Sequence, residues 1–81
     1  MTLDQLRMLV TIADAGGVLA AAEVLHKTQP TLSVAIRKLE EEFGLLLLAR
    51  EGYRAGLTPA GEAFCRQARR VLKESEILAG M

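Results

Sequence analysis

The sequence predicts a mainly α fold, in which a three-helix core carries one short β-hairpin and is followed by a long C-terminal helix. Three observations predict this fold class. Apolar residues recur at steps of three and four in four stretches of the chain, which is the spacing of one helix face. Threonine or glycine residues mark the ends of those stretches. The chain has 81 residues, 51% hydrophobic and 25% charged, a composition typical of one folded domain rather than of a disordered segment.

The first two helices are predicted on either side of a glycine pair. Thr2 can cap a helix whose apolar positions are Leu3, Leu6, Leu9, Val10 and Ala13. Gly16 and Gly17 end that helix. A short second helix is expected over about residues 18–25, with Gly17 serving as its cap. Its alanines make it thin, so that a neighbouring helix can approach closely.

The third helix has the strongest start and stop signals. Thr28 is a good N-cap, and Pro30 fits the first turn because its missing N–H would have no partner there. Gly44 is the expected C-cap. The apolar face consists of Leu32, Ala35, Ile36, Leu39 and Phe43, and the opposite face consists of Thr31, Ser33, Val34, Arg37 and Lys38. The exposed face is therefore polar and basic, apart from Val34.

A short β-hairpin is predicted after the third helix. The run of residues 45–49 is compatible with helix or strand, but its length and the flanking Gly44 and Gly52 favour a strand. A glycine-rich stretch leads from it to Leu57. The hairpin would carry Arg50 and Arg54 near its tip.

The fourth helix is predicted to be long and amphipathic. Thr58 is its N-cap, Pro59 its first residue, and it runs to about Leu78. Its apolar stripe consists of Ala60, Phe64, Ala68, Val71, Leu72, Ser75 and Leu78. Three short helices cannot cover a stripe of that length, so we expect a partner surface; the alternative is a helix that lies along its own domain. We therefore divide the chain into residues 1–58 and a linker or dimerisation helix, residues 59–81.

The charges are arranged in blocks, although 10 basic and 10 acidic residues give a net charge of zero. Residues 27–39 hold three cations and no acid, and residues 40–49 hold three glutamates. Residues 50–73 hold six cations against two acids. In the first interpretation, these charges belong to an ordinary solvated helix surface. In the second, folding gathers the two basic segments on one face, which would suit binding to a nucleic acid.

Several function classes are disfavoured by composition. One Cys (Cys65) and one His (His26) cannot form a disulfide or a tetrahedral zinc site within one chain. The longest apolar run is too short to span a membrane, and the N-terminus is not a signal segment. Ser33 has no activating base in the sequence around it, so catalysis is not expected. We expect a cytoplasmic protein with no cofactor, no metal and no enzymatic activity.

Two helices joined by a tight turn, with a basic face on the second, match the helix-turn-helix plan. The turn is His26-Lys27. The major groove of B-DNA is about 12 Å wide and admits one helix. The N-terminus of that helix offers unpaired N–H groups to a phosphate. Arginines of the hairpin could reach the adjacent minor groove or backbone, as a wing does.

Three motifs at these spacings resemble a known family. They are Gln29-Pro30-Thr31-Leu32-Ser33, Leu39-Glu40-Glu41 and Leu57-Thr58-Pro59-Ala60-Gly61. Together with Leu6, Leu9, Ala21-Ala22-Glu23, Phe43-Gly44 and Arg50, they resemble the N-terminal DNA-binding region of LysR-type transcriptional regulators over essentially the whole chain. The resemblance implies a winged helix-turn-helix, followed by a linker helix that pairs antiparallel with its copy in a homodimer. It also implies that the family's effector-binding domain, which takes a small-molecule inducer, is absent from this chain.

The resemblance assigns roles to individual residues. The implied contacts with double-stranded DNA are Lys27, Thr28, Gln29, Pro30, Thr31, Ser33, Val34, Arg37, Lys38, Arg50 and Arg54. The implied dimer contacts are Phe64, Ala68, Val71, Leu72, Ser75 and Leu78. A dimer would read an interrupted inverted repeat, with the recognition helix in the major groove and the wing on the adjacent backbone or minor groove.

The sequence departs from the family at a few positions. Members often have Ser at Gly17, Thr or Ser followed by Arg at Leu19-Ala20, and Phe at Leu48. Many have Arg at Val34, where this chain loses hydrogen bonding but could touch a thymine methyl group. The departures at Gly17, Leu19-Ala20 and Val34 motivate a second hypothesis, in which the chain is a helical protein-interaction module that uses the Phe64–Leu78 stripe and its helix-turn-helix is idle.

Overall fold

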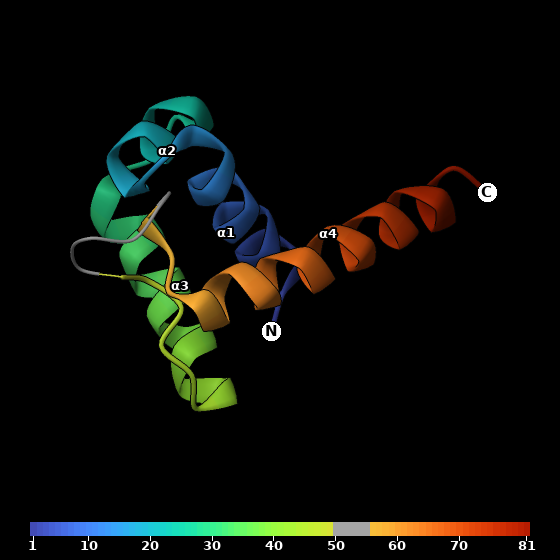
Figure 1. The fold of residues 1–81 in the computed structure, drawn as a ribbon. Helices are drawn as coiled ribbons and strands as arrows, with labels where there is room; N and C mark the ends of the chain where they lie inside the picture. The colour runs from blue at the N-terminus through green and yellow to red at the C-terminus, as the bar shows by residue number, and fades with distance from the viewer. Residues whose placement is uncertain (50–55) are drawn as a thin grey trace.

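The computed structural model describes residues 1–49 and 56–81, and four helices lie within these ranges. They are α1 (Leu3–Ala15), α2 (Val18–Leu25), α3 (Gln29–Phe43) and α4 (Pro59–Ala79). The first three pack into one body, and the distal half of α4 projects away from it (Figure 1). The predicted mainly α fold is confirmed, and the helix bounds agree with the predicted ones to about one residue.

Local capping signals explain why the helices begin where they do. The Thr2 hydroxyl accepts a hydrogen bond from the Gln5 N–H at 3.1 Å, and the Gln5 side chain accepts one from the Thr2 N–H at 2.9 Å. Thr58 caps α4 by accepting from the Gly61 N–H at 2.9 Å. Gly16 ends α1 with φ of 91°, a left-handed conformation that glycine adopts without steric cost.

The core lies where the four helices and the segment after α3 meet. Leu9, Ile12 and Ala21 have no exposed surface, so α2 packs closely on its neighbours as its alanines predicted. The largest fully buried side chains are Leu6, Leu9, Ile12, Leu32, Ile36, Leu39, Leu47 and Leu57. This core fixes α3 with one face inward and the other in solvent.

The predicted β-hairpin is not confirmed. Within the described residues there is no strand, only one antiparallel bridge between Leu48 and Leu57. The Ala49 N–H donates to the Gly56 carbonyl at 2.8 Å. The backbone N–H groups of Leu47 and Leu48 donate to the side chain of Glu40 instead of a partner strand, so no ladder forms at this point. The predicted tip, with Arg50 and Arg54, lies outside the described residues.

Candidate nucleic-acid interface

The outward face of α3 carries the residues predicted to contact DNA. Leu32, Ile36 and Leu39 point into the core. The opposite side consists of Pro30, Thr31, Val34, Arg37 and Lys38, which are exposed, and Ser33, which is half-buried. An α-helix with its side chains is about 10–12 Å across, which matches the width of the major groove. The structure therefore presents these residues together on a helix that can enter a groove.

The first turn of α3 is organised by two threonine hydroxyls. The Thr28 Oγ1 accepts from the Thr31 N–H at 3.3 Å and lies 2.8 Å from the Thr31 Oγ1. Gln29 is the first helical residue and is exposed. The N-terminus of a helix of this length carries a partial positive charge that favours an anion such as a phosphate. Thr28, Gln29 and Thr31 thus lie together at the end of α3 that favours a phosphate.

A left-handed residue sets the angle between α2 and α3. His26 has φ of 54° and is the C-cap of α2. The Lys27 N–H then donates to the Ala22 carbonyl at 2.9 Å, which closes the turn. Lys27 is exposed directly before the N-cap of α3. The turn therefore brings a cation to the same end of α3 as Gln29.

Glu40 holds the segment that follows α3. Its Oε2 accepts hydrogen bonds from the backbone N–H groups of Leu47 at 2.8 Å and Leu48 at 3.1 Å. Leu47 is completely buried, so water cannot replace these bonds at its N–H. The sequence placed this glutamate in an acidic block and in a motif of the family, but it assigned it no structural role. Its position one turn before the end of α3, ahead of an apolar run, was the available signal.

The start of α4 holds the same segment from the other side. The Thr58 N–H donates to the Leu47 carbonyl at 3.0 Å, and the Thr58 hydroxyl donates to the Leu46 carbonyl at 2.5 Å. At Gly61, an added Cβ would lie 2.2 Å from the Leu47 carbonyl oxygen. Only glycine allows α4 to start this close to the segment. We call residues 46–48 with Glu40, Thr58 and Gly61 the backbone clamp.

The clamp places Ala49 and Gly56, the two residues that flank residues 50–55, beside the start of α3. Ala49 and Gly56 are joined by a hydrogen bond. Both line a hollow of about 450 Å³ whose other walls include Leu19 from α2 and Gln29 from α3. The predicted wing residues Arg50 and Arg54 are outside the described residues, but the residues on either side of residues 50–55 are described. Ala49 and Gly56 therefore both lie next to Gln29.

Comparison with known proteins identifies the family. Residues 3–62 match the family described as bacterial regulatory helix-turn-helix protein, lysR family. The chain belongs to the LysR family. Its residues 3–62 are the helix-turn-helix DNA-binding domain of that family.

Curated relatives and solved structures support this assignment. The chain is 42% identical over all 81 residues to the hydrogen peroxide-inducible genes activator of Pectobacterium carotovorum, of which it covers 27%. A full-length OxyR variant from Pseudomonas aeruginosa is 42% identical, with a TM-score of 0.87 over 99% of this chain and 27% of that one. A complex of the CbnR DNA-binding domain with DNA is 36% identical, with a TM-score of 0.88 over 99% of this chain and 92% of that one. The chain thus spans about a quarter of the length of its curated relatives, which are transcriptional regulators and not enzymes.

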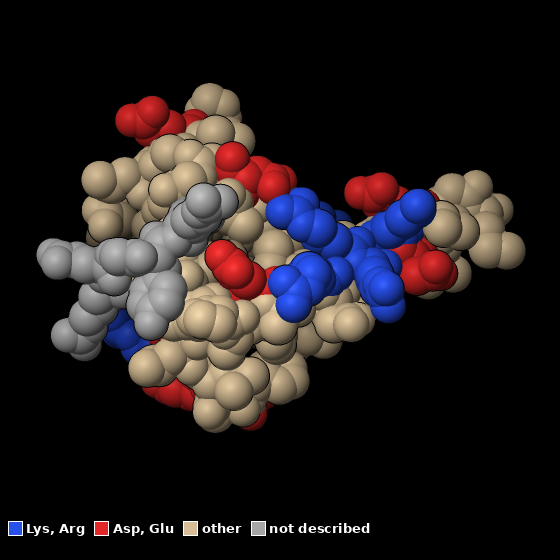
Figure 2. Space-filling view, viewed as in Figure 1, with Lys and Arg blue, Asp and Glu red and all other residues tan. Residues whose placement is uncertain are grey.

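In this LysR-type domain, an ion pair braces α4 against α1. Arg69 Nη2 lies 2.6 Å from the Asp14 carboxylate, and both side chains are about half exposed. The hydrogen bond from Arg69 lowers the pKa of Asp14 below its ordinary range. Burial raises the pKa of the neighbouring Cys65 thiol, which is 4% exposed and so packs as a small apolar residue. Lys and Arg side chains gather over α4 in the space-filling view (Figure 2).

The predicted dimer residues fall on two faces of α4. Ala68 is 2% exposed and belongs to the core, and Leu72 packs against the core. Val71 and Leu78 are 41% and 72% exposed. Phe64 meets Phe43 edge to face, with ring centroids 5.0 Å apart.

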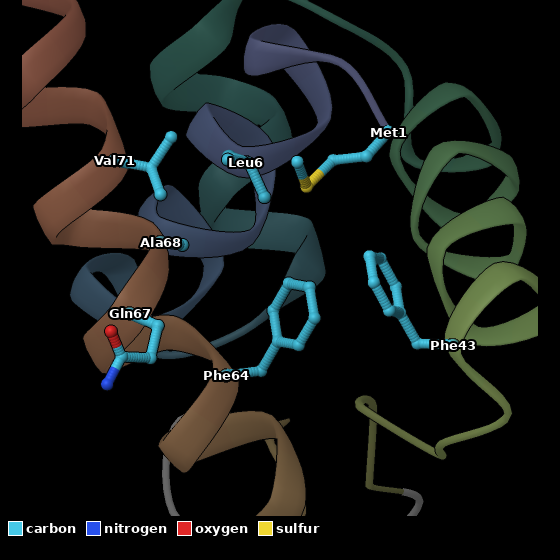
Figure 3. Close-up of a pocket in the computed structure, with 7 residues that line it drawn as sticks. All are labelled: Met1, Leu6, Phe43, Phe64, Gln67, Ala68 and Val71. Atoms are coloured by element: carbon cyan, nitrogen blue, oxygen red, sulfur yellow. The ribbon is translucent and has the colours of Figure 1, made fainter.

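An apolar groove of about 220 Å³ lies beside this pair of rings. Met1, Leu6, Phe43 and Phe64 converge on it, with Ala68 and Val71 on the α4 side (Figure 3). Gln67 completes the lining. The groove lies at the point where α4 leaves the body of the domain.

Two further observations cover the described residues. Among them, no group of three or more His, Cys, Asp or Glu side chains could hold a metal ion. No single described helix is long and apolar enough to cross a membrane; α1 and α2 reach that length only together, across a bend of 118°.

Proposed function

We propose that this domain binds double-stranded DNA sequence-specifically, with α3 in the major groove and residues 50–55 on the adjacent backbone or minor groove as a wing. The observation that carries the proposal is the exposed polar and basic face of α3, with Lys27 and Gln29 at its N-terminus. The DNA complex of the similar CbnR domain supports it. Gln29, Pro30, Thr31, Ser33 and Val34 would approach the bases, whereas Lys27, Arg37, Lys38, Arg50 and Arg54 would contact mainly phosphates.

The test is selection of bound sites from random DNA by the purified domain, followed by a salt titration. If the five proposed cations of each protomer each neutralise one phosphate, a dimer makes ten contacts. The slope of log K against log salt would then be about −9. A slope near zero on every selected DNA would contradict DNA binding.

Two substitutions separate base reading from phosphate binding. Lys38→Ala should weaken binding to all sequences alike and reduce the salt slope by about 2 in a dimer. Gln29→Ala should instead change the discrimination between selected and mismatched sites. Lys73→Ala, which removes a cation from the distal part of α4, is the matched control and should leave both properties unchanged. Identical behaviour of the Lys38 and Gln29 variants would contradict the assigned roles.

We also propose that α4 pairs antiparallel with α4 of a second copy. Phe64, Ala68, Val71, Ser75 and Leu78 are spaced by four, three, four and three residues, which is the repeat of a coiled-coil seam. An antiparallel partner related by a two-fold axis near Val71 would bring its Leu78 to the level of Phe64. Leu78 of one copy would then fill the apolar groove of the other. Ala68 is covered by its own core, so exposed Val71 and the small, half-buried Ser75 would make the contacts between these ends.

Ile77 and Leu78, two adjacent apolar residues near the end of α4, provide a test of the seam. Leu78 lies on it, whereas Ile77, 52% exposed, lies about 100° away around the helix. Burying one leucine contributes about 1.5–3 kcal/mol, and a symmetric dimer loses two. Leu78→Ser should therefore raise the dimer dissociation constant by about 100-fold or more in sedimentation experiments. Ile77→Ser should leave it nearly unchanged, and equal effects of the two changes would contradict the seam.

A protein-interaction module is the second candidate function. The exposed apolar side chains of Ile77 and Leu78 favour it, because a surface helix rarely exposes such residues side by side. Sedimentation with and without DNA at low salt separates the two hypotheses. A dimer that never retains DNA would favour the interaction module.

We propose that the domain acts in the bacterial cytoplasm as part of a longer regulator. The curated relatives are about four times longer than this chain, in line with an effector-binding domain elsewhere in the protein. A small-molecule inducer would bind to that other domain. Joining the chain to such a domain and measuring inducer-dependent DNA affinity tests this proposal.

A further inference from the structure

Val34 is an apolar side chain at the centre of the exposed face of α3. It is 45% exposed and lies one turn after Pro30 and one turn before Lys38. Arg37 is exposed beside it. Among the described residues, Val34 belongs neither to the buried core nor to the side chains packed against it. Apart from Pro30 in the first turn, the valine is therefore the one apolar member of a face that is otherwise polar or cationic.

We infer that Val34 reads a thymine, through contact between its methyl groups and the thymine C5-methyl group. This inference rests on the DNA-binding function proposed above and adds a specificity-determining residue to it. Val34 would make thymine the preferred base at one position in each half-site.

The side chains around Val34 allow the close approach that such a contact needs. Along the middle of the face, Pro30 and Val34 are short, and the flanking Thr31 and Ser33 are short as well. The long cationic side chains, Arg37 and Lys38, follow only after them. Because no long side chain stands at its centre, the first half of α3 can lie deep in a groove about 8.5 Å deep. The Val34 methyl groups can then reach a base edge.

The chemistry of the base edges selects thymine. In the major groove, guanine, adenine and cytosine present hydrogen-bonding atoms, and thymine adds an apolar C5-methyl group. A valine over a hydrogen-bonding atom removes its water without offering a partner, which is unfavourable. Over a thymine methyl group, the same valine buries apolar surface. One buried methyl-sized group changes affinity by about fourfold.

Deoxyuridine provides the direct measurement. It keeps the base pairing of thymine and lacks only the C5-methyl group. After a binding site has been selected from random DNA, each thymine of one half-site is replaced in turn by deoxyuridine. We expect one position at which the replacement weakens binding of the wild-type domain by about fourfold.

Two variants assign that effect to the side chain. Val34→Ser removes the apolar contact from a solvent-exposed helix position, so the fold should be retained, which circular dichroism checks. This variant should bind the thymine and deoxyuridine sites equally, to within a factor of 1.5. Val24→Ser is the matched control, because Val24 is 62% exposed on α2 and lines a different hollow with Thr11 and Asp14. It should keep the fourfold preference.

The outcomes are distinguishable from those for DNA binding itself. Specific binding without sensitivity to deoxyuridine at any position would overturn the inference and leave the proposed function intact. A thymine preference that persists in Val34→Ser would also overturn it, because another residue would then read the methyl group. Failure to select any site would overturn the proposed function, and the inference with it.

Discussion

Replacing Glu40 with alanine should destabilise the domain strongly, although Glu40 lies on the surface side of α3 and is half-buried. The change leaves two backbone N–H groups, those of Leu47 and Leu48, without their acceptor. A hydrogen bond to a charged group contributes about 1.5–3 kcal/mol, and the partial exposure of Glu40 reduces this toward the lower limit. We therefore expect a loss of about 2–4 kcal/mol in the free energy of unfolding.

The expected shift in melting temperature is large enough to measure easily. A domain of 81 residues has an unfolding entropy of about 170 cal/mol/K, so 1 kcal/mol corresponds to about 6 °C. Glu40→Ala should melt about 12–24 °C below the wild type in circular dichroism at one fixed protein concentration. Glu40→Gln keeps an acceptor oxygen and should lose about half as much.

Glu41→Ala is the matched control for Glu40. Glu41 is the next residue of α3 and is exposed. Its replacement should change the melting temperature by no more than about 2 °C. If the Glu40 and Glu41 variants melted at the same temperature, the clamp would not hold the segment after α3. At temperatures where Glu40→Ala is folded, its DNA affinity should also be reduced, because Leu47 and Leu48, which precede the proposed wing, would lose their fixed position.

Two more predictions concern the packing of α4. Gly61→Ala places a Cβ 2.2 Å from the Leu47 carbonyl oxygen, so the backbone must shift, and urea unfolding should show a loss of at least 2 kcal/mol in the free energy of unfolding. Gly80→Ala is the control, because its nearest contact is at 3.6 Å, and it should be nearly neutral. Equal effects of the two changes would contradict the close approach of Gly61 to Leu47. In the wild type, the hydrogen-bonded ion pair with Arg69 lowers the pKa of Asp14 below its ordinary value of 3.8. Asp14→Asn removes this ion pair. The pair therefore stabilises the fold above that pH and is lost as the pH falls through the lowered pKa. The melting difference between wild type and variant should shrink to zero in strong acid, and a difference independent of pH would contradict this assignment.

The helices could be predicted from the sequence because their signals are local. Thr28, with Pro30 two residues later, and Gly44 fix the ends of α3 through neighbours only a few residues away. The exposed face of α3 follows from the same periodicity. Which residues of α3 face solvent was therefore predictable one by one, whereas their contacts with DNA stay a prediction.

The region after α3 could not be predicted in the same way, because its hydrogen bonds are not local. Periodicity treats Glu40 as one residue of an acidic block, yet its carboxylate takes the two N–H groups that a strand would have used. Gly61 is visible as part of a helix start, but its steric role depends on the proximity of Leu47. The ion pair of Asp14 with Arg69 spans 55 positions in the sequence.

The apolar stripe of α4 shows a second limit of periodicity. The sequence places Ala68, Leu72 and Leu78 in one stripe. The structure divides them, because Ala68 and Leu72 pack on the core and Leu78 is exposed. The core-facing side and the exposed side of α4 are about 100° apart around the helix. From the apolar positions in the sequence alone, the two sides look like one broad stripe. Contacts with α1 separate them.

The helix α4 is continuous from the core to its exposed end, so its length and rotation set where that end lies relative to the core. Its buried residues Gly61, Cys65 and Ala68 fix its rotation relative to the core, and the same rotation is carried without a break to Leu78. One residue inserted between Ala68 and Leu78 would turn the distal half by about 100° and advance it by about 1.5 Å. In a dimer built on that half, the separation and phase of the two recognition helices would change together. If the proposed dimer forms, the number of residues in α4 would set the spacing between the two half-sites that it binds.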